Sequence, residues 1–301
     1  MQRAVPRAPF GAGSGLHVCR WPVPRSTRGA RGTARVTVHR AEDDHPPRPR
    51  PHRRRPRRPA AGAPAPIRSA GYRRLMDPRH VRDLLARAPL MARELPGFGA
   101  GADPGAAPAT PTELFAAWLA EAVEAGVLDP GAALLSTAGS DGRPDARIVA
   151  LRDVEPVESA WVFATDAASP KGVQLAQRPA AALTFYWPLQ GRQIRVRGDV
   201  TQAPKDVSLA DFASRSPASK VAGLVGRQST PMGALPEWNE AAERAGRELA
   251  EHPDAHPPGH TVYALAAHHV EFWQGDAGRR HVRLAYAQLP DADWERALLW
   301  P

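Results

Sequence analysis

The feature that most constrains the fold is a change in hydrophobic period after Pro130. Before this residue apolar side chains recur at helical spacing. Beyond it they alternate with polar ones, or form short runs that end at turn residues such as Gly139-Ser140-Asp141-Gly142. We predict strands at 133–137, 147–152, 160–165, 180–187, 193–200, 262–267, 269–273 and 282–288. Short strands at regular spacing are typical of an antiparallel barrel.

Helical patterns flank these strands, so the expected fold class is mainly β with flanking helices (α+β). Thr110-Pro111-Thr112-Glu113 has the residues of a capping box, and the helix that it starts ends near Gly126. Further helical patterns cover 170–177, 208–227 and 237–251, the last with a charged, solvated surface. The residues of the first helix predicted to face the core are Leu114, Trp118, Leu119 and Val123.

The chain before this helix has a different composition. Residues 1–75 contain 18 Arg, no Lys and three acidic residues, a charge of +15, whereas residues 76–301 carry −6. We expect this Arg/Pro-rich tail to be disordered. It is then a nucleic-acid-binding arm, a targeting peptide, or an untranslated stretch upstream of a start at Met76. Scarce aromatic residues speak against the first, and acidic residues and prolines against the second, whereas the abrupt change at Met76 favours the third.

The remaining domain expectations are a short helix and linker at 76–109 and one domain at 110–301. No run of 18 apolar residues occurs, so no transmembrane helix is predicted, and the N-terminus lacks an apolar secretory core. Cys19 is the single cysteine, so no intramolecular disulfide can form. We therefore expect a soluble, cytoplasmic protein. We expect no metal site, because the adjacent His268 and His269 would face opposite sides of a strand.

The predicted strand that ends at Trp273 is followed by charged residues that a hydrophobic core does not need. After Trp273 the chain breaks at Gly275 and Gly278, and three arginines and a histidine follow within five positions. Such a group suits the capture of an anion or stacking on a flat ring, although a solvated hairpin tip is the simpler alternative. The phosphate-loop, dinucleotide and nucleophilic-elbow motifs are absent. Arg, Lys, Gln and Ser at other strand ends therefore indicate an anionic cofactor that carries the reactivity itself.

Six separated blocks resemble, in order, the motifs of the pyridoxamine 5'-phosphate oxidases. They are Arg147-Ile-Val-Ala-Leu-Arg152, Ser169-Pro-Lys-Gly172, Arg192-Gln193, Ser214-Arg215 with Ser219, Arg227-Gln228-Ser229, and Glu271-Phe-Trp-Gln-Gly275 with Arg279, His281 and Arg283. Arg147-Ile-Val, Phe163-Ala-Thr and residues 244–250 resemble the phenazine-biosynthesis branch of this family at least as closely.

The resemblance implies a split β-barrel homodimer with FMN in a cleft between subunits. It implies transfer of a hydride from a small-molecule substrate to FMN and reoxidation by O2 to H2O2. The substrate would be pyridoxamine or pyridoxine 5'-phosphate, or a reduced heterocycle such as a dihydrophenazine carboxylate. A non-catalytic flavin-binding protein is the alternative of another class, and nucleic-acid binding is disfavoured.

Site residues follow from the resemblance position by position. FMN would be bound by Arg147, Ile148, Val149, Arg152, Thr165, Ser169, Lys171, Gln193, Gln228 and Ser229, and from the other subunit by Trp273 and Arg283. The substrate would be bound by Arg152, Asp211, Arg215, Ser219, Arg279 and His281. Arg279 and His281 would be the catalytic pair, with His281 either transferring a proton or positioning the substrate.

Three positions depart from the family pattern. Arg152 replaces a lysine, Pro170 replaces an arginine that would contact phosphate, and Asp211 replaces a tyrosine that would hold the substrate phosphate. An acid at this place would repel a phosphate dianion unless it points away or is neutralised by Arg215. The identity of the substrate therefore stays open.

Overall fold

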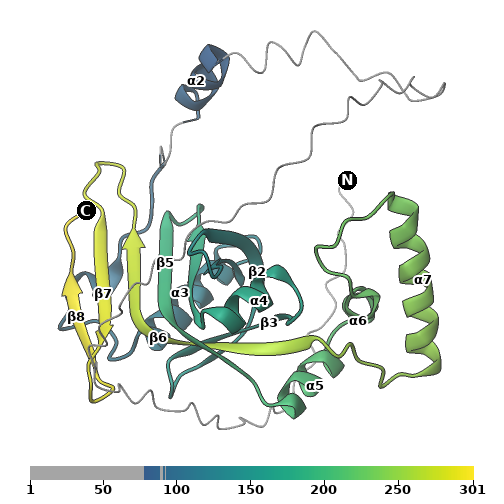
Figure 1. Cartoon of the computed structure of the whole chain (residues 1–301). Helices are drawn as coiled ribbons and strands as arrows, with labels where there is room; N and C mark the ends of the chain where they lie inside the picture. The colour runs from purple at the N-terminus through teal and green to yellow at the C-terminus, as the bar shows by residue number, and fades with distance from the viewer. Residues whose placement is uncertain (1–77, 89–90, 92) are drawn as a thin grey trace, which may run out of the picture. The chain divides into compact units, whose positions relative to one another are not determined.

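The computed structural model describes residues 78–88, 91 and 93–301 (Figure 1). The Arg-rich tail, Met76 and the expectations about them lie outside these residues. The described residues belong to two compact units, one ending at Ala88 and one spanning Pro89–Pro301. In the first, α2 (Pro78–Ala86) is a helix, as predicted for this part of the chain. None of the helices in the described residues is long and apolar enough to cross a bilayer.

The second unit is built on a closed antiparallel barrel, which confirms the expected fold class. Six strands follow one another in the order β3-β2-β1-β4-β5-β6, and β3 pairs back to β6 to close the ring. β7 and β8 continue the sheet beyond β6 (Figure 1). The strands are β1 (Ala132–Ala138), β2 (Pro144–Glu155), β3 (Ala160–Asp166), β4 (Ala180–Trp187), β5 (Arg192–Gln202), β6 (His260–Gln274), β7 (Val282–Gln288) and β8 (Trp294–Leu298).

The prediction of two strands at 262–267 and 269–273 is wrong, because β6 is one long strand. Its first half pairs with β3 and its second half with β7, while β5 accompanies it throughout. The register shifts between Arg197 and Gly198, which leaves His268 unpaired as a bulge. This irregularity lies where β6 changes neighbours and bends (Figure 1). The sequence did not predict β8.

The core fills the barrel and the space between it and α3 (Pro111–Glu124). The predicted capping box is confirmed, since the side chains of Thr110 and Glu113 each accept from the other's backbone N–H. Leu114 and Trp118 are buried, as expected, but the prediction for Val123 is wrong because it is 61% exposed. The buried stripe contains Phe115 and Ala122 instead, and this turns Val123 outward.

One buried cation fixes α3 to the sheet. Arg192, on β5, donates from Nη1 to Glu121 at 2.6 Å and from Nε to Gln274 at 2.9 Å. Its guanidinium lies 4.2 Å from the ring centroid of Trp118, within the range of a cation–π contact. Arg192, part of a family-like block, is therefore structural here.

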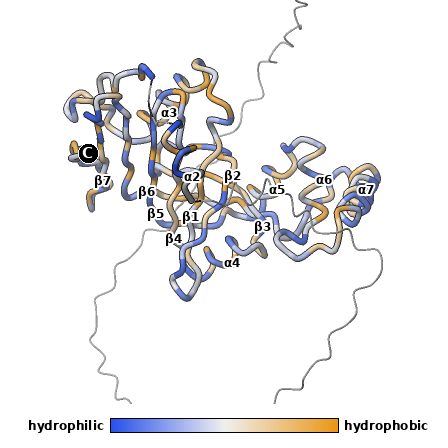
Figure 2. Tube along the Cα trace, turned by 90° about the horizontal axis from the view of Figure 1, so that it is seen from above, coloured by the Kyte–Doolittle hydropathy of each residue, from blue (hydrophilic) through white to orange (hydrophobic). Residues whose placement is uncertain are grey.

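Four helices surround the candidate site. α4 (Pro170–Gln177) ends at Gln177, as predicted, and begins at the N-cap Ser169, which the sequence analysis did not identify as a cap. The expected helix at 208–227 is instead two helices, α5 (Lys205–Ala213) and α6 (Pro217–Val225), because Ser216 caps a new helix with Pro217 in its first turn. α7 (Leu235–Glu251) follows, with a mostly hydrophilic surface (Figure 2). α5, α6 and α7 lie on the side of β3, away from β7 (Figures 1 and 2). A short 3-10 helix, η1 (Gly99–Ala102), lies in the predicted linker.

Candidate functional site

A cavity of about 1160 Å³ is lined by residues from β2, β3, α4 and α6, from the loop after α6, and from the start of α7. It brings together most of the residues that the sequence assigned to cofactor and substrate. Those that line it are Arg147, Ile148, Val149, Arg152, Thr165, Lys171, Arg215, Ser219, Gln228 and Ser229.

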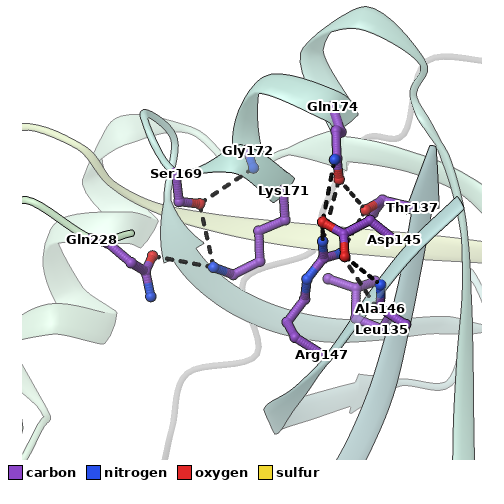
Figure 3. A network of polar contacts seen from close by, with 10 residues as sticks. All are labelled: Leu135, Thr137, Asp145, Ala146, Arg147, Ser169, Lys171, Gly172, Gln174 and Gln228. Carbon is purple, nitrogen blue, oxygen red and sulfur yellow. Dashed lines mark hydrogen bonds and ion pairs between the residues drawn. The ribbon is translucent and has the colours of Figure 1, made fainter. Parts of the chain in front are cut away.

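Lys171 and Arg147 both line this cavity, and their side chains place two positive charges near each other (Figure 3). Lys171 Nζ donates to Ser169 Oγ at 3.3 Å and to Gln228 Oε1 at 3.1 Å, and no carboxylate of the described residues lies within ion-pair distance of it. Burial, and then the charge of Arg147, lower the pKa of Lys171 below its usual range. An anion bound here would relieve this electrostatic cost.

Arg147 is held from several sides. Its Nη1 donates to Thr137 Oγ1 at 2.5 Å, and its Nη2 pairs with Asp145 and donates to Gln174 Oε1 at 3.3 Å. The hydrogen bond from Gln174, with the charge of Arg147, lowers the pKa of Asp145. Our sequence reasoning missed these three neighbours. Asp145 had a signal, since it is two residues before Arg147 on a strand and therefore on the same face.

In the loop after α6, the residues on both sides of Gln228 have an unusual backbone conformation. Arg227 and Ser229 have φ values of 56° and 69°, a region that side chains other than glycine rarely occupy. Gln228 Oε1 accepts from Lys171 and, at 3.4 Å, from Thr165 Oγ1. The amide NH2 group of Gln228 is thereby left to donate toward a ligand. Strain of this kind clusters at ligand-binding segments.

Asp211, on α5, lies at the centre of a charged cluster. Its Oδ1 accepts from Arg152 Nε at 2.7 Å, and its Oδ2 accepts from Arg215 Nε at 3.1 Å and from His260 Nε2 at 2.7 Å. Burial alone would raise the pKa of Asp211, but the hydrogen bonds from His260 and Arg152 and the charge of Arg215 hold it far below its usual range. The charge of Asp211 is therefore neutralised by Arg152 as well as by Arg215, whereas the sequence analysis considered Arg215 alone.

The remaining predicted residues lie elsewhere in the same chain. Gln193, Trp273 and Arg283 are direct cross-strand neighbours on β5, β6 and β7, and none of them lines the cavity. The ring of His281 lies 4.8 Å from that of Trp273, and its Nδ1 accepts from the Asp276 N–H at 3.0 Å. Arg279 is exposed and has a φ of 65°.

One cavity residue of β2, Ile148, shares a face of the sheet with Gln193, Trp273 and Arg283, whereas its neighbours Arg147 and Val149 point to the other face. Ile148, Leu134, Thr184, Arg195 and Glu271 are successive partners across β2, β1, β4, β5 and β6, so their side chains point the same way. Ile148 belongs to the cavity, and Glu271 is two residues from Trp273. Between Ile148 and Trp273 this face exposes apolar surface on Leu134 (37%) and Tyr186 (47%).

Arg283 is already paired within the chain. Its Nε donates to the buried Glu271 Oε1 at 2.9 Å, and its Nη1 donates to the Trp300 carbonyl at 2.7 Å.

The sequence did not indicate two residues that line the cavity, His260 and Trp238. Trp238 lies in the first turn of α7, and its sequence context is that of an ordinary solvated helix.

Comparisons with known proteins show the family to which the chain is similar. Residues 119–274 match the family described as pyridoxamine 5'-phosphate oxidase, and residues 260–301 match the pyridoxine 5'-phosphate oxidase C-terminal dimerisation region. A pyridoxine/pyridoxamine 5'-phosphate oxidase of Leptospira biflexa is 33% identical over 75% of this chain and 99% of its own length. One from Hyphomonas neptunium is 37% identical over 64% of this chain and 87% of its own length.

The chain is also similar to solved structures of related proteins. PhzG from Burkholderia lata, in complex with tetrahydrophenazine-1-carboxylic acid, is 30% identical, with a TM-score of 0.61 over 68% of this chain and 98% of its own. A pyridoxamine 5'-phosphate oxidase-related, FMN-binding protein from Nostoc punctiforme shares the fold at 20% identity, with a TM-score of 0.52 over 62% of this chain and 96% of its own.

Proposed function

Because this chain belongs to the pyridoxamine 5'-phosphate oxidase family, we propose that it is an FMN-dependent oxidase. The observation that carries this proposal is the pair of cations at Lys171 and Arg147, next to the strained loop that presents Gln228. Two positive charges and a free amide donor suit the phosphate of a cofactor. When bound, FMN would supply the redox chemistry, namely hydride transfer from the substrate with O2 as the final electron acceptor and H2O2 as the product.

The chain's own residues would bind and orient. Lys171 and Arg147 would hold the FMN phosphate, with Thr165 and Ser169 beside them and Gln228 and Ser229 donating to the cofactor. Ile148 and Val149 would lie along it on β2. Arg152, Arg215 and Ser219 would bind the anionic end of the substrate, because they line the other part of the cavity around Asp211.

A homodimer would complete the site. Gln193, Trp273 and Arg283 lie on the same sheet face as the cavity residue Ile148, with exposed Leu134 and Tyr186 between them. A twofold axis on this face would bring these three residues of one subunit to the cavity of the other. Arg279 and His281 would then reach the substrate from the partner subunit, where His281 positions it or transfers a proton. The match of residues 260–301 to a dimerisation region supports this arrangement.

Two substrates are candidates. The curated relatives favour pyridoxamine or pyridoxine 5'-phosphate. A reduced heterocycle such as a dihydrophenazine carboxylate is favoured by the similarity to PhzG and by Asp211, which offsets part of the positive charge of Arg152 and Arg215 that would otherwise bind a substrate phosphate.

The test is a peroxide assay of the FMN-loaded full chain with pyridoxamine 5'-phosphate and, separately, a panel of dihydrophenazine carboxylates. We expect one of these classes to reduce the flavin and yield H2O2. A protein that binds FMN but gives no peroxide with either class would be a non-catalytic flavin-binding protein. A protein that does not bind FMN would refute the proposed function altogether.

A further inference from the structure

The Asp211 cluster orients two arginines without using all of their donors. Arg215 directs both Nε and Nη2 at Asp211 Oδ2, each at 3.1 Å, and Arg152 directs Nε at Oδ1. Arg152 Nη1 and Nη2 and Arg215 Nη1 have no hydrogen-bond partner among the described residues, and both arginines line the cavity. The unused N–H groups therefore form a preset anion subsite.

The charge of this subsite limits what it can bind. Two guanidinium groups and one carboxylate leave a net charge of +1 when His260 is neutral. The Asp211 side chain is only 12% exposed, so water screens its charge weakly. One carboxylate would bring the cluster to neutrality. A phosphate monoester, whose second pKa is about 6, would bring two charges and leave an excess of negative charge beside Asp211.

We propose that Asp211 is a specificity-determining residue that makes this subsite accept a singly charged carboxylate and discriminate against phosphate dianions. This inference rests on the proposed function, because it concerns which molecule the flavin site receives. The preference itself can be measured without turnover, so the two can fail separately.

The experiment compares benzoate with phenyl phosphate, two aromatic anions that differ in charge. Their dissociation constants are measured by isothermal titration calorimetry on the FMN-saturated full chain near pH 8. The wild-type protein should bind benzoate more tightly. Asp211→Asn should shift the ratio of the two constants by about tenfold or more toward phenyl phosphate, because it removes the repulsion that acts most on the dianion. Asp206→Asn, the same change at an exposed position of α5, should leave the ratio unchanged.

Arg215→Gln locates the binding, since it should weaken both probes. If Asp211→Asn does not fold, Asp211→Tyr provides the same loss of charge, and the wild-type preference is informative by itself. The inference is overturned if the wild-type chain prefers phenyl phosphate, if neither probe binds, or if the ratio does not move when Asp211 is replaced. FMN binding, titrated beforehand by flavin fluorescence, decides on the proposed function independently of the ratio.

Discussion

Lys171 is the side chain on which cofactor binding should depend most. Lys171 is only 8% exposed, and its ammonium group is oriented by hydrogen bonds to Ser169 and Gln228. Lys171→Met removes a charged donor, worth about 1.5–3 kcal/mol, so FMN affinity should fall by about tenfold to a hundredfold. Fluorescence titration of FMN measures this. Lys205→Met, at the exposed start of α5, is the matched control and should bind FMN normally.

The same lysine gives a pH dependence. Burial and Arg147 lower its pKa below 10.5, so in the free protein it loses its proton at a lower pH than an ordinary lysine. The charged form binds phosphate, and FMN affinity should therefore decline as the pH rises toward 10.5. Lys171→Arg keeps its charge throughout this range, and its affinity should decline less. Identical alkaline profiles for the two proteins would exclude Lys171 as the titrating group.

Asp211 should contribute to stability as well as to specificity. Its folded pKa is depressed, so its contribution is present above the unfolded pKa of about 3.9 and is lost as the pH falls through the lower folded value. Asp211→Asn should lower the free energy of unfolding at pH 7 by about 1–3 kcal/mol. The difference from wild type should shrink below about pH 4. Urea unfolding at both pH values measures it, with Asp206→Asn as the control. A difference independent of pH would show that packing, not charge, is responsible.

At the scale of elements, the bulge between β5 and β6 depends on Gly198. A Cβ at this position would lie 1.9 Å from the carbonyl oxygen of Ala266. Gly198→Ala should therefore force the strands apart and cost about 1–3 kcal/mol, which thermal unfolding can measure. Gly131→Ala is the control, because nothing lies within 4 Å of its Cβ, and it should change stability by less than about 0.5 kcal/mol. Equal effects in the two variants would contradict the close approach.

The sequence predicted those elements whose ends carry local signals. The bounds of β4 and β7 agree with the expected ones, and the α3 capping box was visible in Thr110 and Glu113. Residues 214–216 break the expected long helix with Ser216-Pro217, the same signal as Ser169-Pro170, and this could have been recognised. The continuity of β6 could not, because its bulge is set by the opposite strand. β8 is a short, largely exposed edge strand with no alternating pattern.

For the whole molecule, the order of motifs in the sequence predicted a set of site residues, and only the fold revealed their neighbours. Asp211 was recognised as a departure, but its partners Arg152 and His260 are 59 and 49 residues away in sequence. No local pattern could have predicted that cluster. The division of the predicted site into two separate groups also became visible only with the strand register. In the proposed homodimer neither group is a complete site by itself, so FMN binding would depend on the dimer.

A complementation experiment tests whether two subunits share each site. Lys171→Met damages the cavity group, and Trp273→Leu damages the β5–β7 group. In a heterodimer of these two variants, one site carries both changes and the other carries neither. Random assortment makes half of the dimers mixed, so about a quarter of all sites should be intact. Co-expression should therefore recover about a quarter of the wild-type FMN content, whereas each variant expressed alone should bind little.

The comparison depends on subunit exchange, which differently tagged chains and sequential affinity purification can verify. The purified heterodimer, free of both parents, should bind about one FMN per two chains, with wild-type affinity at that site. This stoichiometry separates a shared site from a site within one chain, because in the second case every cavity would lack either Lys171 or Trp273. A mixed dimer that binds FMN no better than its parents would show that Lys171 and Trp273 act in a site within one chain, whereas normal FMN binding by the Trp273→Leu parent would place Trp273 outside the cofactor site.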